Sequence, residues 1–272
     1  MLRERLVVAI LLLPLALWVI ADGGWLFGLL VASILGLAAL EYGRLSMSSG
    51  FRPSLPLLVG GVVILAITRF LFGFEHAPLT LVILTLGSMA WHLLDYERGA
   101  PRSGTDFAIT TAGVLYLGWI GGFLISLRSL PGGEWWLLLA LPSVWLADSA
   151  AYFVGRRVGR HRLAPRLSPK KTWEGYLSGV VFGALAGAAF AWIWGVGAGP
   201  ASGLVPWRGF LMGAVIAALA PLGDLGISMI KREHGVKDTG SLLPGHGGAL
   251  DRIDSWLWAA VLGFYLVVGL ST

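Results

Sequence analysis

The chain has 272 residues, of which 56% are apolar and only 13% charged, and it carries a formal net charge of +5. About a quarter of the residues of a soluble domain are charged, so this composition excludes an ordinary soluble protein. The absence of cysteine excludes disulfide bonds, and a membrane helix needs roughly 20 apolar residues, which leaves room for about eight to ten such helices.

The predicted elements are hydrophobic segments, the first of which follows Arg3 and Arg5. This segment has the layout of a signal peptide, but no small-residue cleavage site follows it and a second apolar run starts at Gly24, so we interpret it as an uncleaved helix. Continuously apolar runs favour helices over the alternating strands of a β-barrel. We therefore predict an all-α, polytopic integral membrane protein with about nine transmembrane helices. They lie at approximately 6–21, 24–42, 55–73, 77–94, 108–127, 135–156, 174–196, 207–231 and 252–270.

Basic residues fall mainly in alternate loops, which predicts the orientation. The loops opposite to the N-terminus hold only Arg69, Arg128 and Arg208. The positive-inside rule therefore places the N-terminus in the cytoplasm and the C-terminus outside. The predicted location of the protein is the cytoplasmic (inner) membrane. The N-terminal side holds Arg3, Arg5, Arg44, Arg52, Arg98, Arg102, Arg156, Arg157, Arg160, Arg162, Arg166, Lys170, Lys171, Lys231, Arg232, Lys237 and Arg252.

Polar residues divide the chain into two predicted regions. Residues 1–140 are expected to form a scaffold of transmembrane helices. From Asp148 onward, polar residues collect at the cytoplasmic ends of the helices, so residues 141–272 are expected to carry the functional site. Asp148 itself is either a site residue or one half of a structural pair with an arginine such as Arg156.

The loop 156–175 is strongly basic and ends at a predicted helix start. Lys170 and Lys171 precede this helix, and Thr172 is a residue type favoured at an N-cap. A helix N-terminus offers free N–H groups to phosphate oxygens, so we interpret the loop as a polyphosphate site. The alternative is a topological anchor that touches anionic lipid headgroups.

Asp224 lies inside an apolar segment, about two turns before its cytoplasmic end. Asp224, Ser228 and Lys231 are spaced i, i+4 and i+7, so they share one face of a helix. A carboxylate at membrane depth is costly and is therefore a candidate functional group. The alternative is a buried ion pair with a lysine or arginine that locks helices together.

The last helix is preceded by His246, Gly247 and Gly248, and its start carries Asp251 and Asp254. The two glycines permit close approach of the backbone to a ligand. The two carboxylates lie three positions apart and face the same way; they could simply complement the helix dipole. Together with Asp224 they form an oxygen-rich set suited to Mg²⁺.

The segment 228–254, here named the signature segment, reads SMIKREHGVKDTGSLLPGHGGALDRID. It closely resembles the signature of phosphatidate cytidylyltransferases, also called CDP-diacylglycerol synthases. The segments 148–156 and 168–175 are also similar to this family, in the expected order. Ala249 departs from the pattern, which has a larger aliphatic residue there; the change affects packing and leaves the polar positions intact.

The resemblance implies that CTP reacts with phosphatidic acid to give CDP-diacylglycerol and pyrophosphate. It implies Mg²⁺ as cofactor, with a second cation left open, and Asp148, Asp224, Asp251 and Asp254 as its ligands. The catalytic residues are expected to be Asp224, Lys231, Asp251, Arg252 and Asp254. The substrate-binding residues are expected to be Lys170, Lys171, Thr172, Ser228, Arg232, Lys237, His246, Gly247 and Gly248.

Two other functions remain as alternatives. A related CTP-dependent lipid kinase would release CDP instead of pyrophosphate. An ion-coupled secondary transporter would place polar groups near the bilayer midplane and show internal repeats, and the sequence has no evident repeat. The expected partners are CTP and phosphatidic acid in the membrane, with no nucleic acid; a homodimer is left open.

Overall fold

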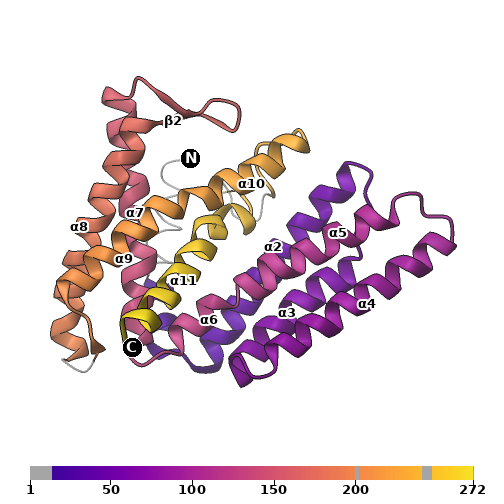
Figure 1. The fold of residues 1–272 in the computed structure, drawn as a ribbon, viewed down its shortest axis with the longest axis horizontal. Coiled ribbons are helices and arrows are strands. Elements are labelled where there is room, and N and C mark those ends of the chain that lie inside the picture. Colours follow the sequence, from indigo (N-terminus) through magenta and orange to yellow (C-terminus); the bar gives the residue numbers. More distant parts are fainter. Residues whose placement is uncertain (1–13, 200–201, 241–246, 272) are drawn as a thin grey trace. The chain divides into compact units, whose positions relative to one another are not determined.

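The computed structural model describes residues 14–199, 202–240 and 247–271. Most of these residues are helical (Figure 1), which confirms the predicted all-α class. The elements in chain order are α2 (Gly24–Ser48), α3 (Leu55–Phe72), α4 (Ala77–Glu97), α5 (Ser103–Gly113), the π-helix η1 (Val114–Ile120), α6 (Phe123–Arg128), α7 (Gly133–Val158), β1 (Arg162–Ala164), β2 (Ser168–Thr172), α8 (Trp173–Ala198), α9 (Pro206–Leu219), α10 (Pro221–Glu233) and α11 (Leu250–Ser271).

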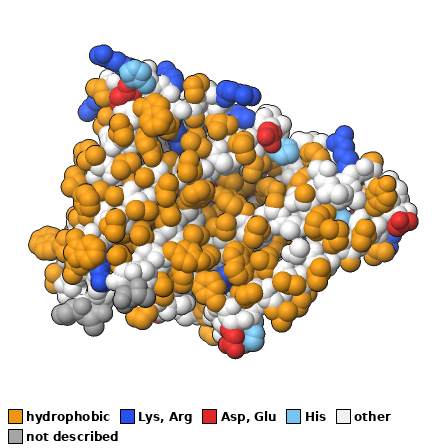
Figure 2. Space-filling view, in the orientation of Figure 1, with side chains coloured by type: hydrophobic (Ala, Val, Ile, Leu, Met, Phe, Trp, Pro, Cys, Tyr) orange, Lys and Arg blue, Asp and Glu red, His pale blue; other side chains and the backbone are white. Residues whose placement is uncertain are grey.

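Eight helical stretches of the described residues are long and apolar enough to cross a membrane. They correspond to the second to ninth predicted segments. Of the first predicted segment, residues 14–21 are helical, and the rest lies outside the described residues. Hydrophobic side chains cover most of the surface drawn in Figure 2, as expected for helices that face lipid.

The chain forms two compact units, and both are discontinuous in sequence. Unit 1 comprises the chain up to Ser126 together with Ile230–Ile253, and unit 2 comprises Leu127–Met229 together with Asp254–Thr272. This division differs from the predicted boundary at residue 140. Most of the signature segment belongs to the same unit as the N-terminal helices.

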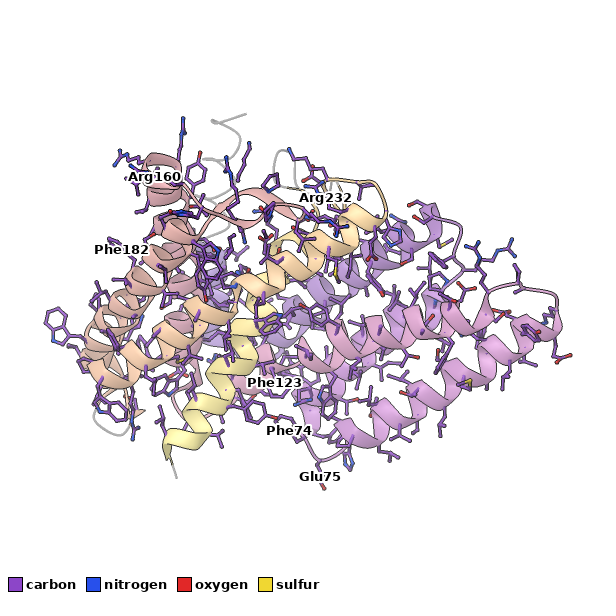
Figure 3. All side chains as sticks on the ribbon, turned by 45° about the horizontal axis from the view of Figure 1, so that its top comes forward. Phe74, Glu75, Phe123, Arg160, Phe182 and Arg232 are labelled. Atoms are coloured by element: carbon purple, nitrogen blue, oxygen red, sulfur yellow. The ribbon has the colours of Figure 1, made fainter. Side chains whose placement is uncertain are left out.

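Unit 1 contains an arginine buried among aromatic rings. The side chain of Arg69, near the end of α3, is 3% exposed. Its guanidinium lies 3.8 Å from the ring centroid of Phe74, 4.7 Å from Trp119 and 5.1 Å from Phe123, and it donates a hydrogen bond to Ser126. Phe74 and Phe123 lie edge to face beside each other (Figure 3). Cation–π contacts and this hydrogen bond compensate the charge for its lost hydration.

In unit 2, α8 and α9 pack closely because glycines face each other. A Cβ atom on Gly187 would collide with the backbone of Gly209, and one on Gly213 would collide with that of Gly183. Small residues at such positions let two helix backbones approach within the membrane.

Two predicted segments are interrupted helices. The segment predicted at 207–231 is divided into α9 and α10 at Pro221, because proline lacks the N–H that would continue the helical hydrogen bonds. The segment predicted at 108–127 changes from α5 to the π-helix and then to α6. The hydrophobicity of a segment predicts how long the membrane span is. It does not predict where the helix within that span is interrupted.

The basic loop is partly ordered as a β-hairpin. Strands β1 and β2 are antiparallel, with Arg162 opposite Thr172 and Ala164 opposite Ser168. The exposed arginines of the loop include Arg160, which Figure 3 labels just before β1. Thr172 caps α8 by accepting a hydrogen bond from the Gly175 N–H at 3.2 Å, so its predicted role as N-cap is confirmed.

Candidate active site

Unit 2 brings together one lysine and two of the predicted carboxylates. Lys171, at the end of β2, forms an ion pair with Asp224 in the first turn of α10. Asp148, an exposed side chain on α7, interacts electrostatically with both of them. The three groups carry one net negative charge, because a single lysine faces two carboxylates. Both side chains of the ion pair are about one-third exposed, at 30% and 33%, so polar ligands can reach them.

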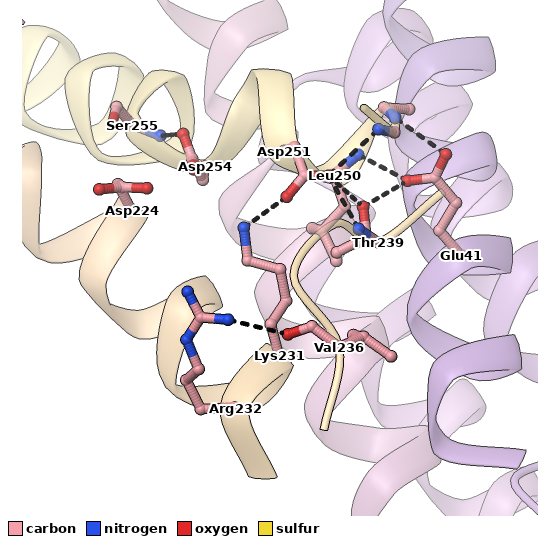
Figure 4. Close-up of polar contacts among 12 residues, drawn as sticks. Glu41, Asp224, Lys231, Arg232, Val236, Thr239, Leu250, Asp251, Asp254 and Ser255 are labelled. Carbon is pink, nitrogen blue, oxygen red and sulfur yellow. Dashed lines mark hydrogen bonds and ion pairs between the residues drawn. The ribbon is translucent and has the colours of Figure 1, made fainter. Parts of the chain in front are cut away.

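Unit 1 contains the second predicted carboxylate–lysine pair. The Lys231 Nζ donates to Asp251 Oδ1 at 2.6 Å, and the two side chains are 9% and 5% exposed. The other carboxylate oxygen, Asp251 Oδ2, accepts from the N–H of Thr239 at 2.8 Å, the N–H of Gly248 at 3.1 Å and the hydroxyl of Thr239 at 2.9 Å. Asp251 is thus fixed on both oxygens (Figure 4).

Glu41 is a polar contact of the signature segment that sequence reasoning missed. This residue of α2 accepts hydrogen bonds from the N–H groups of Ala249 and Leu250, both at 2.9 Å, and from the Thr239 hydroxyl at 3.0 Å. Figure 4 shows its carboxylate next to the start of α11. The available signal was a lone glutamate within an apolar helix, which is a costly position for a charge without partners.

The remaining predicted residues occupy different environments. Ser228 and Asp254 are buried, each at 8% exposure. Gly247 has a φ of 78°, a backbone conformation that favours glycine. His246 lies outside the described residues. The exposed cations are Lys170, Arg232, Lys237 and Arg252.

Among the described residues, no group of three or more His, Asp or Glu side chains is gathered to hold a metal ion. Magnesium, however, is usually held by one or two carboxylates together with substrate phosphates. Asp148 and Asp224 fit such a role, because their shared Lys171 leaves one negative charge uncompensated. Asp251 fits it less well in the geometry seen here, since Lys231 and three further donors use both of its oxygens.

The chain is similar to known proteins along almost its whole length. Residues 3–270 match the sequence profile of the cytidylyltransferase family. A phosphatidate cytidylyltransferase of Pseudomonas aeruginosa is 34% identical, covering 96% of this chain and 94% of the relative. Proteins of the same name from Synechocystis and Brucella suis are 32% and 33% identical, covering 97% and 96% of this chain and 96% and 91% of those relatives.

Proposed function

This chain belongs to the cytidylyltransferase family, and from that membership we infer both its reaction and the roles of its polar side chains. It is a membrane-bound nucleotidyltransferase, a phosphatidate cytidylyltransferase that converts CTP and phosphatidic acid to CDP-diacylglycerol and pyrophosphate. The observation that carries this conclusion is the match to phosphatidate cytidylyltransferases over nearly the whole chain. The relatives support this reaction and neither a lipid kinase nor a transporter.

In this reaction a phosphate oxygen of phosphatidic acid attacks the α-phosphorus of CTP. A new P–O bond forms, the bond from the α-phosphorus to the bridging oxygen breaks, and its electron pair leaves with pyrophosphate. The attacking oxygen is already ionised near neutral pH, so the protein needs no strong general base. Positioning of the two phosphates and neutralisation of their charge can supply most of the catalysis.

The cations of the site divide this work between the two substrates. We assign Lys170 and Lys171 to the phosphates of CTP, because they precede the N-terminus of α8, where the helix dipole favours negative charge. The N–H groups of Trp173 and Gly175 at this end are already bonded to the His161 carbonyl and the Thr172 hydroxyl, so the lysines would supply the donors. We assign Lys231, Arg232, Lys237 and Arg252 to the phosphate groups of the two substrates that Lys170 and Lys171 do not bind. Arg232, Lys237 and Arg252 are exposed, whereas Lys231 is buried and would have to share its contact with Asp251.

Mg²⁺ is the proposed cofactor. Asp224 and Asp148 would hold it, with Asp251 and Asp254 as further proposed ligands. When bound, it would neutralise charge on the phosphates of the substrates. The proposed orientation places the N-terminus and these polar helix ends in the cytoplasm and the C-terminus outside, supported by the distribution of basic residues along the chain.

The reaction is tested with purified protein, phosphatidic acid, Mg²⁺ and CTP labelled at either the α- or the γ-phosphorus. Cytidylyl transfer puts the α-label into lipid and the γ-label into pyrophosphate, in equal amounts. A lipid kinase would put the γ-label into lipid and release CDP. Appearance of the γ-label in lipid, or of neither label, would contradict the assignment.

A further inference from the structure

Glu41 occupies the N-terminal end of α11 in unit 1. The first N–H groups of a helix have no partner within the helix, and the helix dipole makes that end favourable for a negative charge. The two oxygens of Glu41 accept the N–H groups of Ala249 and Leu250, one each, at 2.9 Å. The carboxylate thereby ties α2 to a helix start that lies 209 positions later in the chain.

Thr239 links Glu41 to Asp251. Its hydroxyl oxygen lies 3.0 Å from Glu41 Oε2 and 2.9 Å from Asp251 Oδ2, and its N–H also donates to Asp251. A hydroxyl group has one hydrogen, so it can donate to only one of the two carboxylates at a time. Whichever carboxylate the hydroxyl serves, Glu41 holds the backbone of Ala249 and Leu250, directly before Asp251. The position of Asp251, and through it the ion pair with Lys231, therefore depends on where Glu41 holds the signature segment (Figure 4).

Two glycines of the signature segment leave the space that the Glu41 carboxylate fills. A Cβ atom on Gly240 would lie 2.7 Å from Glu41 Oε1. A Cβ atom on Gly248 would collide with Glu41 Oε2 and with the Thr239 hydroxyl. A side chain at either position would therefore displace the Glu41 carboxylate from the place where its hydrogen bonds hold it.

We propose that Glu41 is a positioning residue for the reaction: through Thr239 and the start of α11 it holds Asp251 in place against Lys231. This inference rests on the proposed function. It assigns a role in catalysis to a helix that lies within the region predicted to be scaffold. Glu41 itself contacts neither substrate in this role and acts only through the residues that it orients.

The test compares Glu41→Gln with Glu97→Gln, a matched control at an exposed glutamate at the end of α4. Glutamine keeps the size of the side chain but replaces one acceptor oxygen with an NH₂ group, so one of the two backbone N–H groups loses its partner. Loss of a group that orients an active-site residue typically costs about 10- to 100-fold in activity. We expect this loss in kcat, with KM values for both substrates near those of the control, because only the preorganised geometry is disturbed.

Amide hydrogen exchange of residues 247–253, measured without substrates, provides a readout that does not depend on activity. Glu41→Gln should accelerate exchange there, and Glu97→Gln should not. Unchanged exchange, or accelerated exchange with the kcat of the control, overturns the proposal. If unmodified protein failed to transfer the cytidylyl group, the proposed function would fail while the exchange result still reported on Glu41.

Thr239 gives a second test if Glu41→Gln does not purify. Thr239→Val removes the hydroxyl that links the two carboxylates, and Thr239→Ser keeps it. A fall in kcat for valine with recovery of much of it for serine supports the proposal, and equal kinetics for the two variants overturn it. Where Glu41→Gln is stable, it can be combined with Thr239→Val. The fold-decrease in kcat of this double variant should be smaller than the product of the two single fold-decreases, since both substitutions disturb one network.

Discussion

At the residue scale, the carboxylate of Asp224 is the group whose charge the site depends on most directly. Asp224→Asn keeps the shape of the side chain but removes the carboxylate that forms the ion pair with Lys171. We expect kcat to fall by about 10²-fold or more, the range seen when one preorganised electrostatic group is removed from an active site. Cytidylyl transfer is measured at fixed Mg²⁺, with Asp95→Asn on α4 as control. Activity equal to that of the control would remove Asp224 from the site.

Lys170 and Lys171 should give different kinetic effects although they are neighbours in sequence. Lys170 is exposed, whereas Lys171 pairs with Asp224. Lys170→Gln should raise the KM for CTP by about tenfold, which corresponds to the free energy of one hydrogen bond to a charged group. The KM for phosphatidic acid should stay nearly unchanged. Lys171→Gln should mainly lower kcat, because it also changes the surroundings of Asp224.

The control for both lysine variants is Arg166→Gln, at another exposed cation of the same hairpin. If the lysines only anchor the hairpin to anionic lipid, all three variants will keep their CTP kinetics. The yield of correctly inserted protein would then fall instead. Kinetics of both substrates on inserted protein distinguish these cases.

At the scale of elements, the contact of α8 with α9 depends on glycine. Gly187→Ala places a methyl group against the backbone of Gly209, so we expect destabilisation of about 1–3 kcal/mol. Gly87→Ala on α4 meets nothing within 4 Å. That control should keep or slightly raise stability, since alanine favours a helix by about 1 kcal/mol over glycine. Thermal unfolding in detergent measures both; equal midpoints would contradict the close packing.

The elements also differ in how far sequence could predict them. The spans were predictable because the length of an apolar run is a local property. The N-cap at Thr172 was predictable for the same reason, since it needs only a residue three positions later. The β-hairpin and the π-helix were not predicted, because their hydrogen bonds depend on conformations that composition does not encode.

At the scale of the whole molecule, the distribution of basic residues predicts topology. A reporter fused after Thr272 should appear outside, and one inserted within 158–168 should appear in the cytoplasm. Reporter activity on each side of the membrane in intact cells measures both. Finding the two reporters on the same side would change the number of spans between them by one and would require a different placement of the site.

The sequence by itself determined that the chain is a polytopic helical membrane protein, and it identified the signature segment and most of the candidate residues. These inferences depend on local composition and spacing. Tertiary structure alone decided the pairing of the charges. Asp224 and Lys231 share a helix, yet each pairs with a residue from another element, Lys171 and Asp251. Glu41 and Asp251 meet at Thr239 for the same reason: a buried charge must find partners, and folding supplies them from distant positions in the chain.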